Sequence, residues 1–199
     1  MRQLLACLFA LAVLAADPTA PWQGPVPARA AVAVAFSLDE LVARSTHAVV
    51  ARAIERRSLW IELGGGRRIV TYTKLAAQQT LLGPAEKDLW VRTLGGVVGK
   101  IGQQVSGEAQ IEPGSLSLLF LTRAGDGELV VSGMAQGHYP IREASAGAPA
   151  RLRRSGEIGL LLHPRGRRVV PVTSELDDRD LDSAIAAVRA AKARRDARP

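Results

Sequence analysis

The sequence predicts one small, mainly β domain, built as a barrel or a sandwich and followed by a terminal helix. Between residues 48 and 135, short apolar-biased segments alternate with turns that contain Gly and Pro, a spacing typical of such folds. The 199 residues are enough for one domain with extensions and too few for two domains with cores of ordinary size. The hydrophobic fraction of 47% and the charged fraction of 23% are near globular averages, which argues against wholesale disorder.

Residues 1–30 have the pattern of a secretory signal peptide with an exit segment. A short positive start, Met1-Arg2-Gln3, precedes an unbroken apolar run over residues 4–16, and a polar, Pro-rich stretch follows. The apolar run is shorter than the ~20 residues that a membrane span needs, so a cleaved signal fits better than an anchor. Residues 28–30 have the small-x-small form of a cleavage site, and residues 13–15 are an earlier candidate. We therefore expect an exported protein, periplasmic or extracellular, with no transmembrane span after cleavage.

Cys7 is the only cysteine of the chain. Residues 4–7 have the letters of a lipoprotein box, but they lie where the apolar run begins, so a lipid anchor is not favoured. Cleavage after Ala30 would leave no thiol, which excludes disulfides, Cys-zinc sites and Cys nucleophiles together.

Residues 37–141 are predicted to form the barrel. Ser37 has the position of an N-cap and Glu40 that of its capping-box partner, so a short helix is expected there. Gly-rich segments are predicted as a hairpin turn at 64–67 and as a loop at 95–102. The predicted strands occupy residues 48–54 and 59–63, with a break at 55–57, then 68–81, 88–94, 105–111, 116–122 and 128–135.

The composition of the sequence changes after residue 141, because residues 144–150 are small and favour a flexible backbone. Residues 142–173 are predicted as a small β extension, with strands at 152–154, 158–162 and 168–172. Residues 174–199 are predicted as a C-terminal helix and basic tail, because Leu181, Ile185 and Val188 lie on one stripe. Acidic residues precede this stripe and basic residues follow it, which suits the helix dipole.

Residues that commonly carry catalysis or bind metal are dispersed. His47, His138 and His163 each stand alone, without the paired spacing of metal ligands on a helix. Ser106 lacks the context of a nucleophile elbow, and residues 95–101 lack the hydroxyl of a phosphate-binding loop. We predict no catalytic residue, no metal site and no cofactor. A hydrolase assembled from His138 and distant carboxylates is the less favoured hypothesis.

A polar patch on the strands is the candidate binding site. Its residues lie on successive predicted strands, and we expect them to share a surface; they are Tyr72, Arg92, Thr93 and Gln136. The net charge of +7 fits either a solvated surface, which we favour, or a site for a polyanion. Nucleic acid is not expected as a partner, because an aromatic fraction of 4% is low for a protein that stacks on bases.

A series of motifs with regularly placed glycines runs through the predicted barrel. They are residues 89–96 (Leu-Trp-Val-Arg-Thr-Leu-Gly-Gly), Gly99, Gly102, residues 105–108, 113–114, 118–121 and 133–137. Together with their surroundings over residues 37–141, they resemble a group of exported bacterial proteins of unknown function. The chain departs from that pattern at His47, where an Asp is favoured, and at Ser115, where a Glu is favoured, which weakens any site inferred there.

The order of the elements carries a second resemblance. A strand reading Ala-Val-Val-Ala-Arg-Ala at 48–53, a long hairpin ending at residues 82–84 and a strand around Phe120 resemble the OB-like barrel of netrin-like domains and tissue inhibitors of metalloproteinases. This resemblance implies a small OB-like barrel of five to six strands. The amino-terminal Cys by which those inhibitors chelate the zinc of a protease has no counterpart here, so their mechanism is not implied.

These observations predict an exported, non-enzymatic β-barrel domain. We expect it to serve as a protein-interaction or envelope-associated module, with an extracellular protease as one candidate partner. The alternative is a module that binds a polyanion or single-stranded nucleic acid.

Overall fold

The computed structural model describes residues 32–145, 148–163, 166 and 169–198. The expected signal peptide, its cleavage sites and Cys7 lie outside these residues. The prediction of a mainly β fold with a terminal helix is confirmed. No helix in the described ranges is long and apolar enough to cross a membrane.

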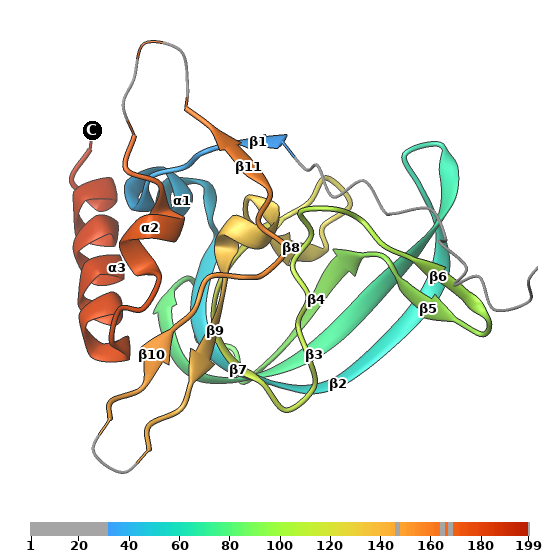
Figure 1. The fold of residues 1–199 in the computed structure, drawn as a ribbon, viewed down its shortest axis with the longest axis horizontal. Helices are drawn as coiled ribbons and strands as arrows, with labels where there is room; N and C mark the ends of the chain where they lie inside the picture. Colours follow the sequence, from blue (N-terminus) through green and yellow to red (C-terminus); the bar gives the residue numbers. More distant parts are fainter. Residues whose placement is uncertain (1–31, 146–147, 164–165, 167–168, 199) are drawn as a thin grey trace, which may run out of the picture.

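Figure 1 shows the helices gathered on one side of the molecule and the long strands on the other. The strands are β1 (Val32–Val34), β2 (His47–Leu63), β3 (Gly66–Leu82), β4 (Asp88–Leu94), β5 (Gly96–Val98), β6 (Ile101–Gln103), β7 (Leu116–Arg123), β8 (Leu129–Val131), β9 (His138–Arg142), β10 (Arg151–Leu152) and β11 (Leu160–Leu162). The helices are α1 (Leu38–Arg44), the 3-10 turn η1 (Met134–Gly137), α2 (Val172–Leu176) and α3 (Leu181–Asp196).

The main sheet closes on itself as an OB-like barrel. Its strands follow the order β7-β2-β3-β4-β8, and β8 pairs back onto β7. Strand β8 runs parallel to β4, with only the pairs Val91–Leu129 and Arg92–Val130. The closure is therefore uneven, because β4 continues beyond the short β8 and its last residues leave one end of the barrel open.

Strands β2 and β3 form one long antiparallel hairpin (Figure 1). Gly64 and Gly65 have φ of 61° and 77°, which suits the tight two-residue turn that joins the strands. The predicted break at 55–57 is wrong, since β2 runs through these residues without interruption. The strand can contain consecutive polar residues because their side chains find partners on both faces of the sheet. Arg56 forms an ion pair with Glu112 on one face, and Arg57 lies over the ring of Trp90 on the other.

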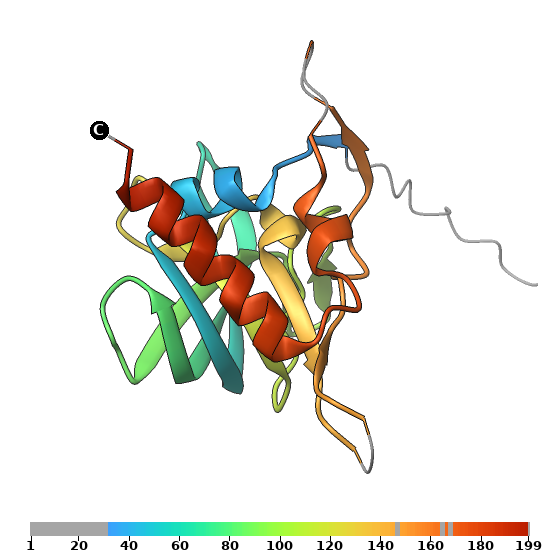
Figure 2. The ribbon, with the colours of Figure 1, turned by 90° about the vertical axis from the view of Figure 1, so that its left-hand side faces the viewer.

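Two apolar cores lie on opposite faces of β7. Leu119 and Leu121 point into the barrel, whereas Leu118 and Phe120 point toward the helices. This alternation gives β7 a continuous apolar sequence, because the strand is buried on both faces. Figure 2 shows α3 crossing the outside of the sheet. Its buried residues Ile185 and Val188 belong to the core on the helix side of β7, together with Leu118 and Phe120. The predicted apolar stripe of this helix is confirmed.

The short helix predicted after Ser37 is also confirmed. The Ser37 hydroxyl accepts a hydrogen bond from the Glu40 backbone, and the Glu40 carboxylate accepts one from the Ser37 backbone. Within residues 174–199, α3 begins at Leu181 and is capped by Asp180. The short helix α2, which ends at Leu176, was not predicted.

Several strand predictions between β4 and β11 are wrong. Residues 105–111 form no strand: the Glu108 backbone N–H donates to the Val105 carbonyl, and the chain turns at Gly107 with φ of 81°. Ala109 and Ile111 of this segment pack into the barrel core. The alternation of apolar and polar residues therefore marks the side chains that are buried, although the backbone does not pair with another strand. Other differences are a β5–β6 hairpin that occupies the predicted loop 95–102 and extends to Gln103, shorter strands at 129–131, 151–152 and 160–162, and no strand over the described residues of 168–172. Strands β1 and β9 were not predicted.

Candidate functional site

A cavity of about 820 Å³ opens at the uneven end of the barrel. Its walls come from β2, β3, the end of β4, the β5–β6 hairpin and residues 103–112, and Glu157 adds a carboxylate from beyond β10. Ala109 and Ile111 belong both to the barrel core and to the lining, so the cavity reaches the interior of the barrel. Only the tertiary structure brings these segments together.

Hydroxyl groups from three neighbouring strands meet on one wall of the cavity. Ser58, Thr71 and Thr93 lie side by side because the strand register pairs Ser58 with Thr71 and Thr71 with Thr93. The Thr71 hydroxyl donates to the Gly95 carbonyl at 2.7 Å, and the Ser58 and Thr71 hydroxyl oxygens lie 2.8 Å apart. Since Thr71 has one hydroxyl hydrogen, Ser58 is the donor of the second bond.

Two glycines allow the backbone to approach this wall. Gly96 has φ of 132°, and a Cβ there would overlap the hydroxyl oxygens of Thr71 and Ser58. Gly95 has φ of 90°, and its Cβ would lie 2.6 Å from the Gln103 carbonyl oxygen. Both positions therefore need glycine for conformation and for space.

Glu108 carries a buried carboxyl group in the cavity lining. It is 8% exposed, and it accepts hydrogen bonds from the backbone N–H of Ala109, at 3.1 Å, and of Leu94. Burial disfavours the charged form and raises the pKa of Glu108 above its ordinary value, although the two N–H groups act against this shift. Sequence reasoning did not predict Glu108 as a site residue, although Glu108 ends the motif at residues 105–108 that the first resemblance includes.

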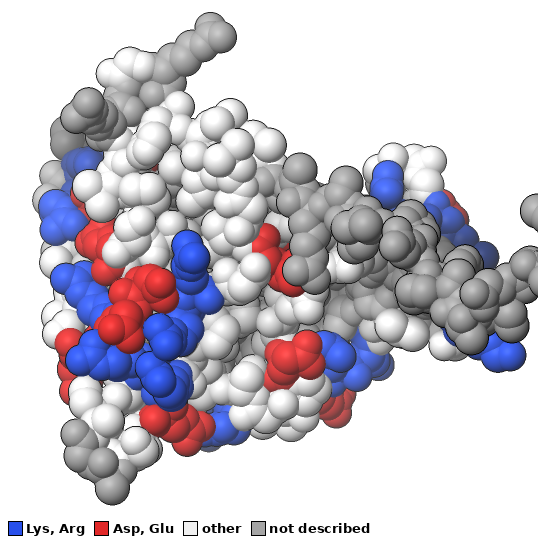
Figure 3. Space-filling view, in the orientation of Figure 1, with Lys and Arg blue, Asp and Glu red and all other residues white. Residues whose placement is uncertain are grey.

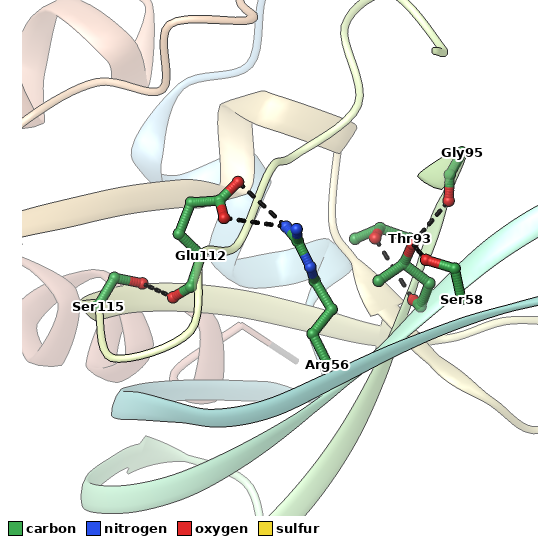
Figure 4. Close-up of polar contacts among 7 residues, drawn as sticks. Arg56, Ser58, Thr93, Gly95, Glu112 and Ser115 are labelled. Carbon is green, nitrogen blue, oxygen red and sulfur yellow. Dashed lines mark hydrogen bonds and ion pairs between the residues drawn. The ribbon is translucent and has the colours of Figure 1, made fainter. Parts of the chain in front are cut away.

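Arg56 and Glu112 form an ion pair at the rim. The Arg56 Nη1 atom lies 3.0 Å from each carboxylate oxygen of Glu112. Figure 4 shows the Arg56 side chain between Glu112 and the hydroxyl groups of Ser58 and Thr93. Ser115 donates its hydroxyl to the Glu112 carbonyl at 2.5 Å and so supports the turn that carries the pair.

The four residues of the predicted patch do not share one surface. Tyr72 and Arg92 are neighbours on β3 and β4, on the face opposite to Thr93, because successive residues of a strand point to opposite faces. Thr93 lines the cavity. Gln136 is 3% exposed, and its amide bonds to the Phe36 N–H at 3.1 Å and to the Val34 carbonyl at 2.9 Å.

The histidines lie in separate surroundings. His47 is buried beside the Thr46 hydroxyl, 2.9 Å from its Nδ1 atom. The His138 Nε2 atom lies 3.2 Å from the Ser117 hydroxyl, and both residues are almost fully buried. Burial lowers the pKa of His138 to about 4. In the part of the chain that the structure describes, no group of three His, Cys, Asp or Glu residues is placed to hold a metal ion.

Comparison of the chain with protein-family models finds no match, and comparison with curated protein sequences finds none.

Proposed function

We propose that this chain is an exported, non-enzymatic binding module that takes a polar segment of a partner protein into the cavity at the end of the barrel. The observation that carries the proposal is the cavity itself, whose volume of about 820 Å³ lies within the range of ligand sites. Its polar groups are held by the sheet and by the Arg56–Glu112 pair, so the site is formed before a partner binds.

The resemblance to netrin-like domains makes an extracellular protease one partner to test. The mouth of the cavity offers Gln104 and Gln110, whose exposed amides can donate to and accept from a peptide backbone. A segment of a few residues fits the available volume.

Site-specific photo-crosslinking tests this function. A photoreactive amino acid replaces Gln110 in the lining or, as the matched control, Gln78, which is exposed on β3 outside the lining. The probes are an envelope fraction of the native cell and purified extracellular proteases. We expect one partner to crosslink at position 110 only, and the substitution Gln104→Trp to reduce that product. Equal products at both positions, or none at position 110, would overturn the proposal.

A second candidate function is polyanion binding on the outer face of β2, β3 and β4. Arg57 lies 4.9 Å from the ring centre of Trp90, and Tyr72 and Arg92 are adjacent on the same face. Two of its cations already have partners, since Arg92 pairs with Asp126 and Lys74 with Asp88. Elsewhere on the molecule, basic and acidic side chains are also intermixed, as the left-hand side of Figure 3 shows.

Salt dependence tests the second candidate. Titration with heparin and with a single-stranded oligonucleotide at two salt concentrations would show affinity falling steeply with salt if phosphates or sulfates are bound by this face. Arg57→Gln would then weaken binding, whereas the absence of salt-dependent binding would exclude the polyanion function.

A further inference from the structure

The charge of the cavity has the opposite sign to that of the whole chain. The chain carries a net charge of +7, whereas the charged residues in the lining are Glu108, Glu112 and Glu157 against Arg56. Glu112 is already neutralised by its ion pair with Arg56. The remaining carboxylates give the cavity an excess of negative charge.

Glu108 is the buried member of this group. Its described hydrogen bonds come from the backbone N–H groups of Ala109 and Leu94, which stabilise a carboxylate without neutralising it. Among the described residues, no Lys, Arg or His forms an ion pair with Glu108. A buried carboxylate in this position gains from an external cation, because pairing offsets the cost of its desolvation.

Building on the proposed function, we infer that the cavity recognises a basic side chain, a lysine or an arginine of the partner segment, through the carboxylate of Glu108. Glu157 adds a second negative charge at the lining. Arg56 does not oppose the incoming cation strongly, because Glu112 contacts its guanidinium at 3.0 Å. The hydroxyl wall of Ser58, Thr71 and Thr93 faces the same space and provides polar surroundings.

The affinity for a basic side chain depends on pH with a defined sign. Only ionised Glu108 pairs with a cation, and burial holds its pKa above the ordinary value of a glutamate. The affinity therefore rises as the pH rises through that pKa. Three other charged groups face the cavity, namely Arg56, Glu112 and Glu157. Arg56 and Glu112 form an ion pair with each other. The substitution Glu157→Gln therefore measures how much the carboxylate of Glu157 contributes to the pH dependence.

The test uses peptides that differ at one position. A host peptide of alternating Gly and Ser, blocked at both ends, carries lysine, arginine, norleucine, glutamine or glutamate at its centre. Binding to the full chain is followed by NMR chemical-shift changes, which also report where the peptide binds. We expect the lysine or arginine peptide to bind at least about tenfold more tightly than the norleucine peptide, a difference of about 1.4 kcal/mol. Shift changes should centre on the cavity residues.

Two variants assign the preference to Glu108. Glu108→Gln keeps the shape of the side chain and should bring the basic peptides to the affinity of the norleucine peptide, whereas the matched control Glu62→Gln, exposed on β2 outside the lining, should not. If Glu108→Gln does not fold, Gln110→Lys serves instead, because a lysine at this exposed lining position should compete with the basic peptides.

The outcomes separate this inference from the proposed function. Neutral and basic peptides that bind the cavity equally well would overturn the inference and leave the binding function standing. Basic peptides that bind Glu108→Gln as tightly as the unsubstituted chain would also overturn it. A partner crosslinked at position 110 whose binding is insensitive to Glu108→Gln would support the function without the charge preference. If no peptide binds at the cavity and no partner crosslinks at position 110, both the proposed function and the charge preference are overturned.

Discussion

The Nη1 atom of Arg92 lies 2.6 Å from the Oδ2 atom of Asp126. This contact joins β4 to the turn before β8, at the seam where the barrel closes through two residue pairs. Arg92 is only 6% exposed. Burial disfavours the charged guanidinium, but hydrogen bonds to Asp126 and Tyr72 outweigh this effect and raise the pKa of Arg92. The ion pair therefore links the two strands at the junction of the barrel where only two residue pairs are formed.

Asp126→Asn is expected to lower the melting temperature, because it leaves the buried cation of Arg92 without its carboxylate. Asp88→Asn is the matched control, since Asp88 pairs with the more exposed Lys74 at 3.3 Å. The bond with Arg92 holds the pKa of Asp126 below its ordinary value. The stabilisation is therefore present above the pKa of an unfolded Asp and is lost as the pH falls through the folded value. Equal effects of both substitutions at neutral pH would contradict this role.

Acid is expected to destabilise the fold through His138. Burial lowers its pKa to about 4, whereas an unfolded histidine titrates near pH 6.5, so the unfolded state binds more protons between these values. The stability is complete above the unfolded pKa and falls as the pH decreases toward the folded pKa. The loss due to His138 amounts to about 2 kcal/mol at pH 5. Urea unfolding at pH 7 and pH 5 measures it, and His138→Gln should lose that much less on acidification. An unchanged loss in the variant would show that other groups cause the pH dependence.

Gly96→Ala is expected to destabilise the chain more than Gly99→Ala. Both glycines have positive φ, 132° and 61°, so each substitution introduces backbone strain of about 1–3 kcal/mol. Only a Cβ at residue 96 would also overlap Thr71 and Ser58, whereas nothing lies within 4 Å of a Cβ at residue 99. Thermal unfolding of both variants compares them. Similar losses would mean that the close approach at Gly96 is relieved by movement of the hydroxyl groups.

Gln136→Ala is expected to loosen the segment that precedes α1. The amide of Gln136 bonds to the backbone of Val34 and Phe36, and its loss leaves two part-buried backbone groups without these bonds. An unsatisfied buried group costs about 1–3 kcal/mol. Hydrogen exchange at residues 34–36 should become faster, while Gln78→Ala on the exposed face of β3 should change nothing. Unchanged exchange at Phe36 would contradict the tethering role of Gln136.

Local sequence patterns predicted much of the fold. The capping box of Ser37, the Gly64–Gly65 turn and the stripe of Ile185 and Val188 are all present in the structure. Each of these features depends on contacts between residues that are close in the sequence, or on one apolar face. The strand predicted at 105–111 failed because alternation indicates which side chains are buried, and it does not distinguish pairing from packing.

The candidate site was much less predictable. Thr93 is the one residue of the predicted patch that lies in the cavity lining, and it lies on the strand face opposite to Arg92. The motif at residues 105–108 contains Glu108 but does not show that its carboxyl group is buried, because that burial comes from segments that are remote along the chain.

The sequence by itself determined the mainly β class, the turns of the long hairpin and the amphipathic terminal helix, since these follow from backbone preferences and short-range periodicity. Only the tertiary structure decided that β8 closes against β4 over a short length, and that Ser58, Thr71, Thr93 and Glu108 surround one cavity. The reason is physical: strand register and the packing of residues 103–112 across the barrel end are settled by many weak long-range contacts, which no local pattern encodes.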